Sequence, residues 1–167
     1  TMPLSPETIG FLLQNKIQND RDWFAEHHAE FQRCVLSPLA ELVEALTPVM
    51  RQIDPLLVCE PKVGKCISRI YRDTRFSRDK SIFRDNMWWV FVRIKKIYRG
   101  SPGFFFDFSS DGFSYGYGYY QADHKSLSRI RTLVLCDDPH WRRADRAFSR
   151  QKKFTLEGDL YKRTRFS

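Results

Sequence analysis

The sequence has few cysteines, and none of them lie close together. Cys34, Cys59, Cys66 and Cys136 form no C-x-x-C pair, and this spacing excludes a zinc knuckle and a thioredoxin-type redox motif. We interpret the four side chains as reduced, mostly buried thiols of a protein from a reducing compartment.

Long apolar runs and the common catalytic motifs are also missing. No stretch approaches the roughly 20 apolar residues that span a bilayer, and the chain opens with a helix signal in place of a secretory leader. We therefore expect a cytoplasmic protein without a membrane partner. The motifs G-x-S-x-G, G-x-G-x-x-G, the P-loop and the kinase set are absent, and the His-containing run 26–30 lacks the H-E-x-x-H order. The sequence predicts no cofactor and no metal site.

Acidic residues are fewer than basic ones. Twenty Asp and Glu face 28 Lys and Arg, which leaves a formal charge of +8 and favours anionic partners such as nucleic acid or phosphorylated metabolites. The apolar fraction of 42% and the aromatic fraction of 15% exceed those of disordered chains. A chain of 167 residues suits one hydrophobic core, so we expect a single domain over residues 1–167.

Residues 1–55 are predicted to form a helical layer. Helix starts are indicated by Ser5-Pro6-Glu7 and by Ser37-Pro38, where a hydroxyl cap precedes proline at the first helical position. Asn19-Asp20 is expected to end the first helix and to cap a second, which continues to the third. Two prolines are interpreted as the far end of the layer: Pro48 and Pro55.

The hydrophobic period becomes strand-like from Cys66 onward. Ser109-Ser110-Asp111-Gly112 predicts a tight hairpin turn. We expect an α+β fold with an antiparallel sheet of four to five strands over 64–120, packed against the helical layer. Residues 122–167 are expected to add further helices and a last short strand over 154–160. The candidate strands of the sheet are 66–72, 88–95, 103–109 and 112–120, with 88–95 expected in a central position.

The strand over 112–120 places four aromatic side chains on one face. These residues are Phe113, Tyr115, Tyr117 and Tyr119. A stripe of this kind either packs in the core or stacks on the bases of a single-stranded nucleic acid. We favour core packing, because few other large residues would fill that part of the sheet.

The segment Arg69–Lys80 carries five cations and two carboxylates in twelve residues. If 66–72 is a strand, these charges converge at its carboxyl end. Arginine offers planar, bidentate donors that suit phosphate or carboxylate. Asp73 and Asp79 would hold the arginines in place. Alternatively, one of them would act as a general base if its surroundings raised the pKa of its carboxyl group.

Three functions stay open for this segment. The segment could bind a phosphate-bearing small molecule or another anion, nucleic acid included. It could instead be the active site of an enzyme that acts on a phosphorylated or nucleotide substrate. The third alternative is a network of ion pairs that only stabilises an interaction or structural protein. The oligomeric state is not predicted. The candidate ligand-binding residues are Arg69, Arg72, Arg75, Lys80 and, as a second wall, Lys162; the candidate catalytic residues are Asp73 and Asp79.

Three stretches of the chain resemble one protein family. They are Asn19–Phe24, Arg69–Lys80 and Leu156–Arg163, and the glycine-rich strand 112–118 adds to the likeness. The family is the uncharacterised one called domain of unknown function 2461. The resemblance implies no activity, cofactor or partner.

The chain differs from that family pattern in two places. Ser81-Ile82-Phe83-Arg84 stands where the family usually has Thr-Pro-Tyr-Lys. The chain also lacks the stretch that similar proteins carry beyond Lys162-Arg163, so we expect an incomplete C-terminus and a site list that is partial.

Overall fold

The computed structural model describes residues 4–93, 100–155, 157 and 158. The chain divides into two compact units, Thr1–Asp123 and His124–Ser167. That they form a single domain stays a prediction. Within the described ranges, no helix combines the length and the apolar character needed to cross a bilayer.

The first unit begins with a series of helices. The signals at Ser5 and at Asn19-Asp20 are confirmed, whereas the predicted hydroxyl cap at Ser37 is not formed, because Leu36 before α4 is already helical. Ser5 has extended backbone before α1, and its N–H donates to Thr8 Oγ1 at 3.2 Å. Asn19 ends α1 in the left-handed region, and the Asp20 carboxylate caps α2 by accepting the Trp23 N–H at 2.8 Å. The elements are α1 (Pro6–Gln18), α2 (Arg21–Glu26), α3 (His28–Phe31), the π-helix η1 (Gln32–Leu36) and α4 (Ser37–Ile53).

The helix predicted between α1 and α4 is divided into three pieces, α2, α3 and η1. The wider turns of the π-helix place Cys34 and Val35 in the core, where they are 4% and 0% exposed. There the Cys34 carbonyl accepts the hydroxyl of the buried Thr8 at 2.7 Å. The π-helix thus fastens the helical layer to α1.

Pro48 lies inside α4, so the prediction that it marks the end of the helical layer is wrong. Proline lacks the N–H that would bond to the carbonyl of Glu44, and α4 gives up that hydrogen bond. The helix nevertheless continues to Ile53, because Leu39 and Val43 on its inner face are fully buried. Tertiary packing outweighs the local cost of the proline.

In the described ranges, the sheet has three antiparallel strands in the order β1-β2-β3. Ser109 pairs with Gly112 across the predicted turn, and Gly112 takes a φ of 141°, which favours glycine. The middle strand of the three is β2. As expected of a central strand, β1 is also bonded on both sides, because the Ser68 N–H donates to the Trp88 carbonyl and the Val90 N–H to the Cys66 carbonyl at its other edge. Their bounds are β1 (Asn86–Val92), β2 (Gly103–Ser109) and β3 (Gly112–Gly118).

The predicted strand over 66–72 is not formed: the segment has only isolated bridges, and four to five strands are not confirmed. Ile67 bridges to Trp89 of β1, whereas Tyr71 bridges to Phe83 in its own following segment. The ladder cannot continue because the two ends of the segment have different partners. The last predicted strand, 154–160, is not formed at its described residues, and 156, 159 and 160 lie outside them.

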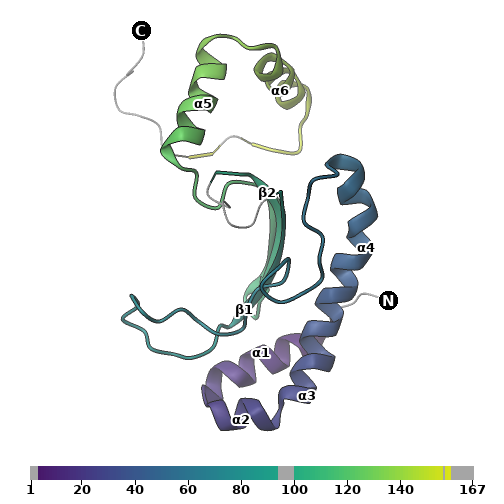
Figure 1. The fold of residues 1–167 in the computed structure, drawn as a ribbon, viewed down its shortest axis with the longest axis vertical. Helices are drawn as coiled ribbons and strands as arrows, with labels where there is room; N and C mark the ends of the chain where they lie inside the picture. Colours follow the sequence, from purple (N-terminus) through teal and green to yellow (C-terminus); the bar gives the residue numbers. More distant parts are fainter. Residues whose placement is uncertain (1–3, 94–99, 156, 159–167) are drawn as a thin grey trace. The chain divides into compact units, whose positions relative to one another are not determined.

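One face of β1 forms the centre of the core. Met87, Trp89 and Phe91 are 0%, 6% and 0% exposed and pack with buried side chains of the helices. Figure 1 shows α4 running alongside the sheet, with the chain that follows α4 returning between them. This return segment is joined to β1 by the Val58 N–H, which donates to the Val92 carbonyl at 2.9 Å.

The aromatic stripe of β3 is not part of this core, so the preference for core packing is wrong. Phe113, Tyr115 and Tyr117 are 70%, 75% and 61% exposed, and Tyr119 is half-buried. The core contains residues of the helices, β1 and β2 but none of β3. The stripe lies beyond the area that the helical layer covers.

The second unit contains the helices α5 (His124–Leu135) and α6 (Pro139–Arg150). Both were predicted. Asp138 caps α6 by accepting the His140 N–H at 2.8 Å.

Two fully buried polar side chains of α1 differ in how their hydrogen bonds are satisfied. The Thr8 hydroxyl donates to the Cys34 carbonyl, whereas neither Nδ2 nor Oδ1 of Asn15 has a partner among the described residues. A buried amide without partners costs about 1–3 kcal/mol, and a satisfied hydrogen bond contributes about 1 kcal/mol.

We expect Asn15→Leu to raise the free energy of unfolding by about 1 kcal/mol, because it removes unpaired polar atoms and keeps the shape of the side chain. Thr8→Val, the matched change at a satisfied position, should lower it by about 1 kcal/mol. Denaturant titration of both variants measures this. A loss of stability in Asn15→Leu would show that a buried water satisfies the amide.

Candidate functional site

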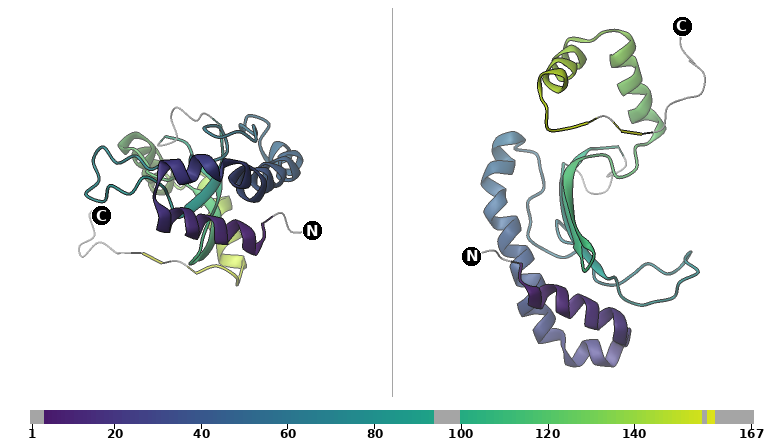
Figure 2. Two further views of the ribbon diagram at one scale, coloured as in Figure 1. Left: turned by 90° about the horizontal axis from the view of Figure 1, so that it is seen from below. Right: turned by 180° about the vertical axis from the view of Figure 1, so that it is seen from behind.

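The segment Arg69–Lys80 and the residues that follow it form a loop that is closed at its base. The Arg72 N–H donates to the Ile82 carbonyl at 2.9 Å, and the Arg84 N–H donates to the Ile70 carbonyl at 2.8 Å. Residues 73–81 lie between these two contacts. Figures 1 and 2 show the loop, in blue-green, extending away from the helices and the sheet of the first unit.

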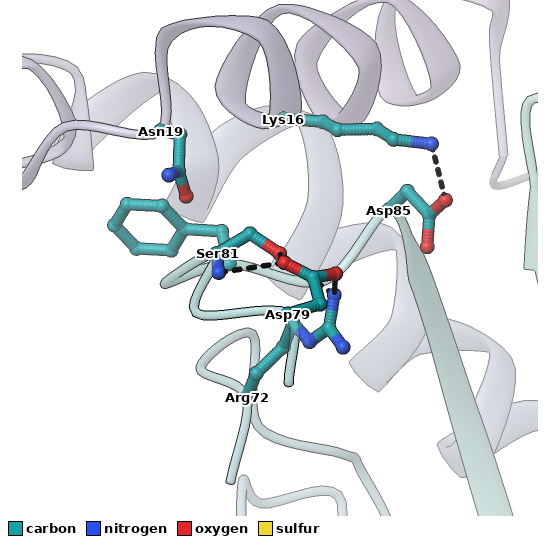
Figure 3. A pocket seen from close by; sticks show the side chains of 7 residues that line it. Lys16, Asn19, Arg72, Asp79, Ser81 and Asp85 are labelled. Carbon is teal, nitrogen blue, oxygen red and sulfur yellow. Dashed lines mark hydrogen bonds and ion pairs between the residues drawn. The ribbon is translucent and has the colours of Figure 1, made fainter. Parts of the chain in front are cut away.

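Arg72, Asp79 and Ser81 form a compact hydrogen-bonded group at the base of this loop (Figure 3). Arg72 Nη1 donates to Asp79 Oδ2 and to Ser81 Oγ, the latter at 2.7 Å. Asp79 Oδ1 accepts both the backbone N–H of Ser81, at 2.9 Å, and its hydroxyl, at 2.7 Å. Three residues of the loop thereby hold one another in a single arrangement.

The C-terminal end of α1 lies against the same part of the loop. Asn19 Oδ1 accepts the Ile82 N–H at 2.7 Å, and Lys16 Nζ pairs with Asp85 Oδ2 at 2.6 Å. Asn19 can reach the loop because its left-handed backbone ends the helix there.

These groups enclose a hollow of about 290 Å³, which we call the loop pocket. Figure 3 shows its polar side chains, contributed by α1 and by the loop. The lining residues are Lys16, Asn19, Arg72, Asp79, Ser81, Phe83 and Asp85.

Hydrogen bonds keep the charged groups of the loop pocket ionised. The backbone and hydroxyl of Ser81, followed by Arg72, lower the pKa of Asp79 from 3.8 to about 2. The hydrogen bond from Lys16 lowers the pKa of Asp85, and the same bond raises the pKa of Lys16. At neutral pH the loop pocket therefore holds two cations and two carboxylates.

Several predicted site residues lie in the loop but do not line the pocket. Arg75 pairs with Asp73 through two contacts, Nε to Oδ1 at 2.9 Å and Nη2 to Oδ2 at 2.6 Å. This pairing is the main cause that lowers the pKa of Asp73 to about 2. Lys80 Nζ donates to the Thr74 carbonyl at 2.9 Å. These bonds are local and stiffen the loop.

The remaining two predicted residues are elsewhere. Arg69 is exposed, its guanidinium lies near Gly64, and it pairs with no carboxylate of the described part of the chain. Lys162 lies outside the described residues. Of the seven predicted residues, the structure brings only Arg72 and Asp79 together in the loop pocket.

Sequence reasoning missed five residues that line the loop pocket: Lys16, Asn19, Ser81, Phe83 and Asp85. Asn19 does stand at the start of the first stretch on which the family resemblance rests. Lys16 and Asp85 had no signal, because one is a surface residue of a helix and the other lies 69 positions later in the chain.

A larger hollow, of about 400 Å³, lies along α6 in the second unit. Its lining residues, Pro139, Arg142, Asp145 and Arg146, come from one helix, and all four are exposed. Groups on a single helix do not converge on a ligand as groups from separate elements do. We therefore place the candidate site in the loop pocket.

The described residues contain no group of three or more His, Cys, Asp or Glu side chains positioned to hold a metal ion. The His27 ring stacks on Trp23, with ring centroids 4.1 Å apart, and its Nδ1 is 2.8 Å from the Trp23 carbonyl.

Comparison with known proteins complements this geometry. No curated protein and no solved structure matches the chain. The model of one family, described as conserved hypothetical protein (DUF2461), matches residues 7–166, which is nearly the whole chain and includes every residue of the loop pocket. The chain therefore belongs to the DUF2461 family of conserved hypothetical proteins.

Proposed function

We propose that the loop pocket binds a phosphate-bearing small molecule or another small anion, with Arg72 as its main donor. The observation that carries the proposal is the state of the Arg72 guanidinium. One of its nitrogens, Nη1, is held by Asp79 and Ser81, while Nε and Nη2 donate to no described residue. The side chain is 30% exposed at the wall of the pocket.

A guanidinium fixed on one side is a prepared anion receptor. Its planar fork matches two oxygens of a phosphate or carboxylate, and its orientation is already set before the ligand arrives. Less side-chain entropy is then lost on binding than with a freely rotating arginine. Lys16 adds a second cation, since its ammonium has three donors and only Asp85 receives one of them among the described residues.

The charge of the surrounding segment also favours an anion. Residues 69–84 carry six cations and two carboxylates, a surplus of four positive charges. Arg78 and Lys80 are exposed and form no ion pair within the described part of the chain, so their charge is not cancelled locally. A positive potential of this kind raises the local concentration of anions.

The size of the pocket favours a small molecule over a nucleic acid strand. Its volume of about 290 Å³ is at the lower end of the range for ligand sites, roughly 300–1,000 Å³. One phosphate group with a small remainder fits that volume.

Asp79 is assigned an orienting role in this proposal. A general base at neutral pH needs a raised pKa, and the surroundings of both Asp73 and Asp79 lower theirs to about 2. Ionised carboxylates at these positions hold Arg75 and Arg72 in place.

The first test is a thermal-shift screen of inorganic phosphate, sugar phosphates and nucleotides. We expect one class to stabilise the wild type, by about 2.7 kcal/mol when the ligand is at a hundred times its Kd. Arg72→Ala should fold and lose this response. Arg33→Ala removes an equal charge from an exposed ion pair with Glu7, away from the pocket, and should keep it.

Two results would contradict the proposal. Equal weakening by both variants would mean that ligands respond only to net charge, and no response of the wild type to any compound would mean that the network is structural. A short oligonucleotide tested at low and moderate salt distinguishes a nucleic acid partner from a small anion. Several phosphate contacts make the affinity for a nucleic acid fall steeply with salt.

The second test concerns pH. The folded pKa of Asp79 is below its ordinary value, so its stabilising effect is complete above about pH 4 and is lost as pH falls toward 2. Asp79→Asn should flatten the dependence of unfolding free energy on pH between 5 and 2. Glu41→Gln on α4, an exposed carboxylate without an ion pair to any described residue, is the control and should follow the wild type. Parallel curves for all three proteins would refute the assigned role.

A further inference from the structure

The strand β3 is the last strand of the sheet order, and one of its edges has no neighbour in the part of the chain that the structure describes. It pairs with β2 on one side, and no described residue pairs with it on the other. In an antiparallel ladder alternate residues bond to each neighbour, so half of the N–H and C=O groups of β3 point away from β2. These groups are available to another strand.

Edge strands are normally protected against such pairing, and β3 is not. Soluble proteins place charged side chains, proline or a bulge on their sheet edges. The seven residues of Gly112–Gly118 include no charged residue and no proline. Their pairing with β2 runs through all seven positions without a bulge. The absence of these devices along the whole strand is typical of an edge that is covered.

The exposed side chains of β3 also indicate that another molecule covers this strand. Phe113, Tyr115 and Tyr117 share one face and are 70%, 75% and 61% exposed. Together they expose about 400 Å² of largely apolar surface per copy, and the largest apolar patch of a soluble protein, which is often functional, has about this size. Their rings continue the partly buried aromatic face of β2, since Phe113 and Tyr117 lie 6.2 and 4.6 Å from Phe106 and Phe104 between centroids.

We propose that β3 pairs with the β3 strand of a second copy of this chain, antiparallel, about a two-fold axis at Tyr115. A two-fold interface requires a surface that complements itself. In this register Tyr115 lies opposite Tyr115 of the second copy and Phe113 opposite Tyr117. Ser114 lies opposite Gly116, and Gly112 opposite Gly118. Aromatic side chains meet aromatic side chains, small residues meet small residues, and the two sheets become one.

Charge argues for a second copy over a nucleic acid strand on this face. Base-stacking surfaces are accompanied by Lys and Arg that contact the phosphates, and β3 carries neither. A neutral strand can approach its own copy without like-charge repulsion, even though each chain has a formal charge of +8. This inference is independent of the loop pocket.

The first experiment measures the mass of the protein in solution by light scattering over a range of concentrations. We expect the wild type to form a dimer. Tyr115→Lys should be a folded monomer by circular dichroism, because two ammonium groups would face each other across the axis. Ser114→Lys places the same charge on the opposite face of the strand, where it lies directly opposite Gly116 of the second copy and has a like charge only at the more distant diagonal position, and it should remain a dimer.

The second experiment tests the register by disulfide cross-linking in a Cys136→Ser background, since Cys136 is the exposed native thiol. Cysteines at position 115 would have Cα atoms about 5.5 Å apart, which a disulfide spans. Cysteines at position 113 would be separated by roughly 14 Å along the strands and cannot be joined. Tyr115→Cys should therefore cross-link under mild oxidation, and Phe113→Cys should not.

The proposal is overturned if the wild type is a monomer at all concentrations, which would mean that some other occupant covers β3. It is equally overturned if Tyr115→Lys stays a dimer, or if Phe113→Cys cross-links as well as Tyr115→Cys.

Discussion

Burial of one face of β1 under the helical layer holds the first unit together. Met87, Trp89 and Phe91 form the centre of a core to which α1, α3, η1 and α4 contribute buried side chains. Fully burying such a side chain contributes about 1.5–3 kcal/mol. The position of the helices over β1 has two consequences. It brings the end of α1 to the loop that precedes β1, and it leaves β3 uncovered.

The loop pocket is a product of the first consequence. The Asn19 amide accepts the Ile82 N–H, and Lys16 pairs with Asp85, so two contacts join α1 to the chain just before β1. Within the loop, carboxylates are used to fix arginines: Asp79 holds Arg72, and Asp73 holds Arg75. Exposed ion pairs of this kind contribute little to stability. Their physical effect is to orient guanidinium groups in a segment, residues 69–84, where cations outnumber carboxylates.

The low pKa values of the two loop carboxylates connect structure to function. A carboxylate with a pKa of about 2 is a weak base, but it is a permanent partner for arginine at every physiological pH. Membership of a family without an assigned activity adds no constraint on the ligand. The proposed function therefore depends on the geometry of Arg72 and its neighbours.

The features that were predictable from sequence depend on contacts between near neighbours. The caps at Ser5 and Asp20, the break at Asn19 and the turn before Gly112 each involve residues at most four positions apart, and each forms as expected. Their stereochemistry is local, so the tertiary structure has little influence on it. Arg72 and Asp79 were likewise found because they lie close together in one unusually charged segment.

The features that only the tertiary structure decided depend on distant residues or on the area that a layer covers. Pro48 stays within α4 because of packing, and the segment 66–72 loses its ladder because its two ends find different partners. Lys16 meets Asp85 across 69 positions of the chain. The sequence by itself determined the local elements and where the charge is concentrated. The folded core decided which charged groups share a pocket and which aromatic residues stay exposed, because the helical layer is wide enough to bury β1 and part of β2 but not β3.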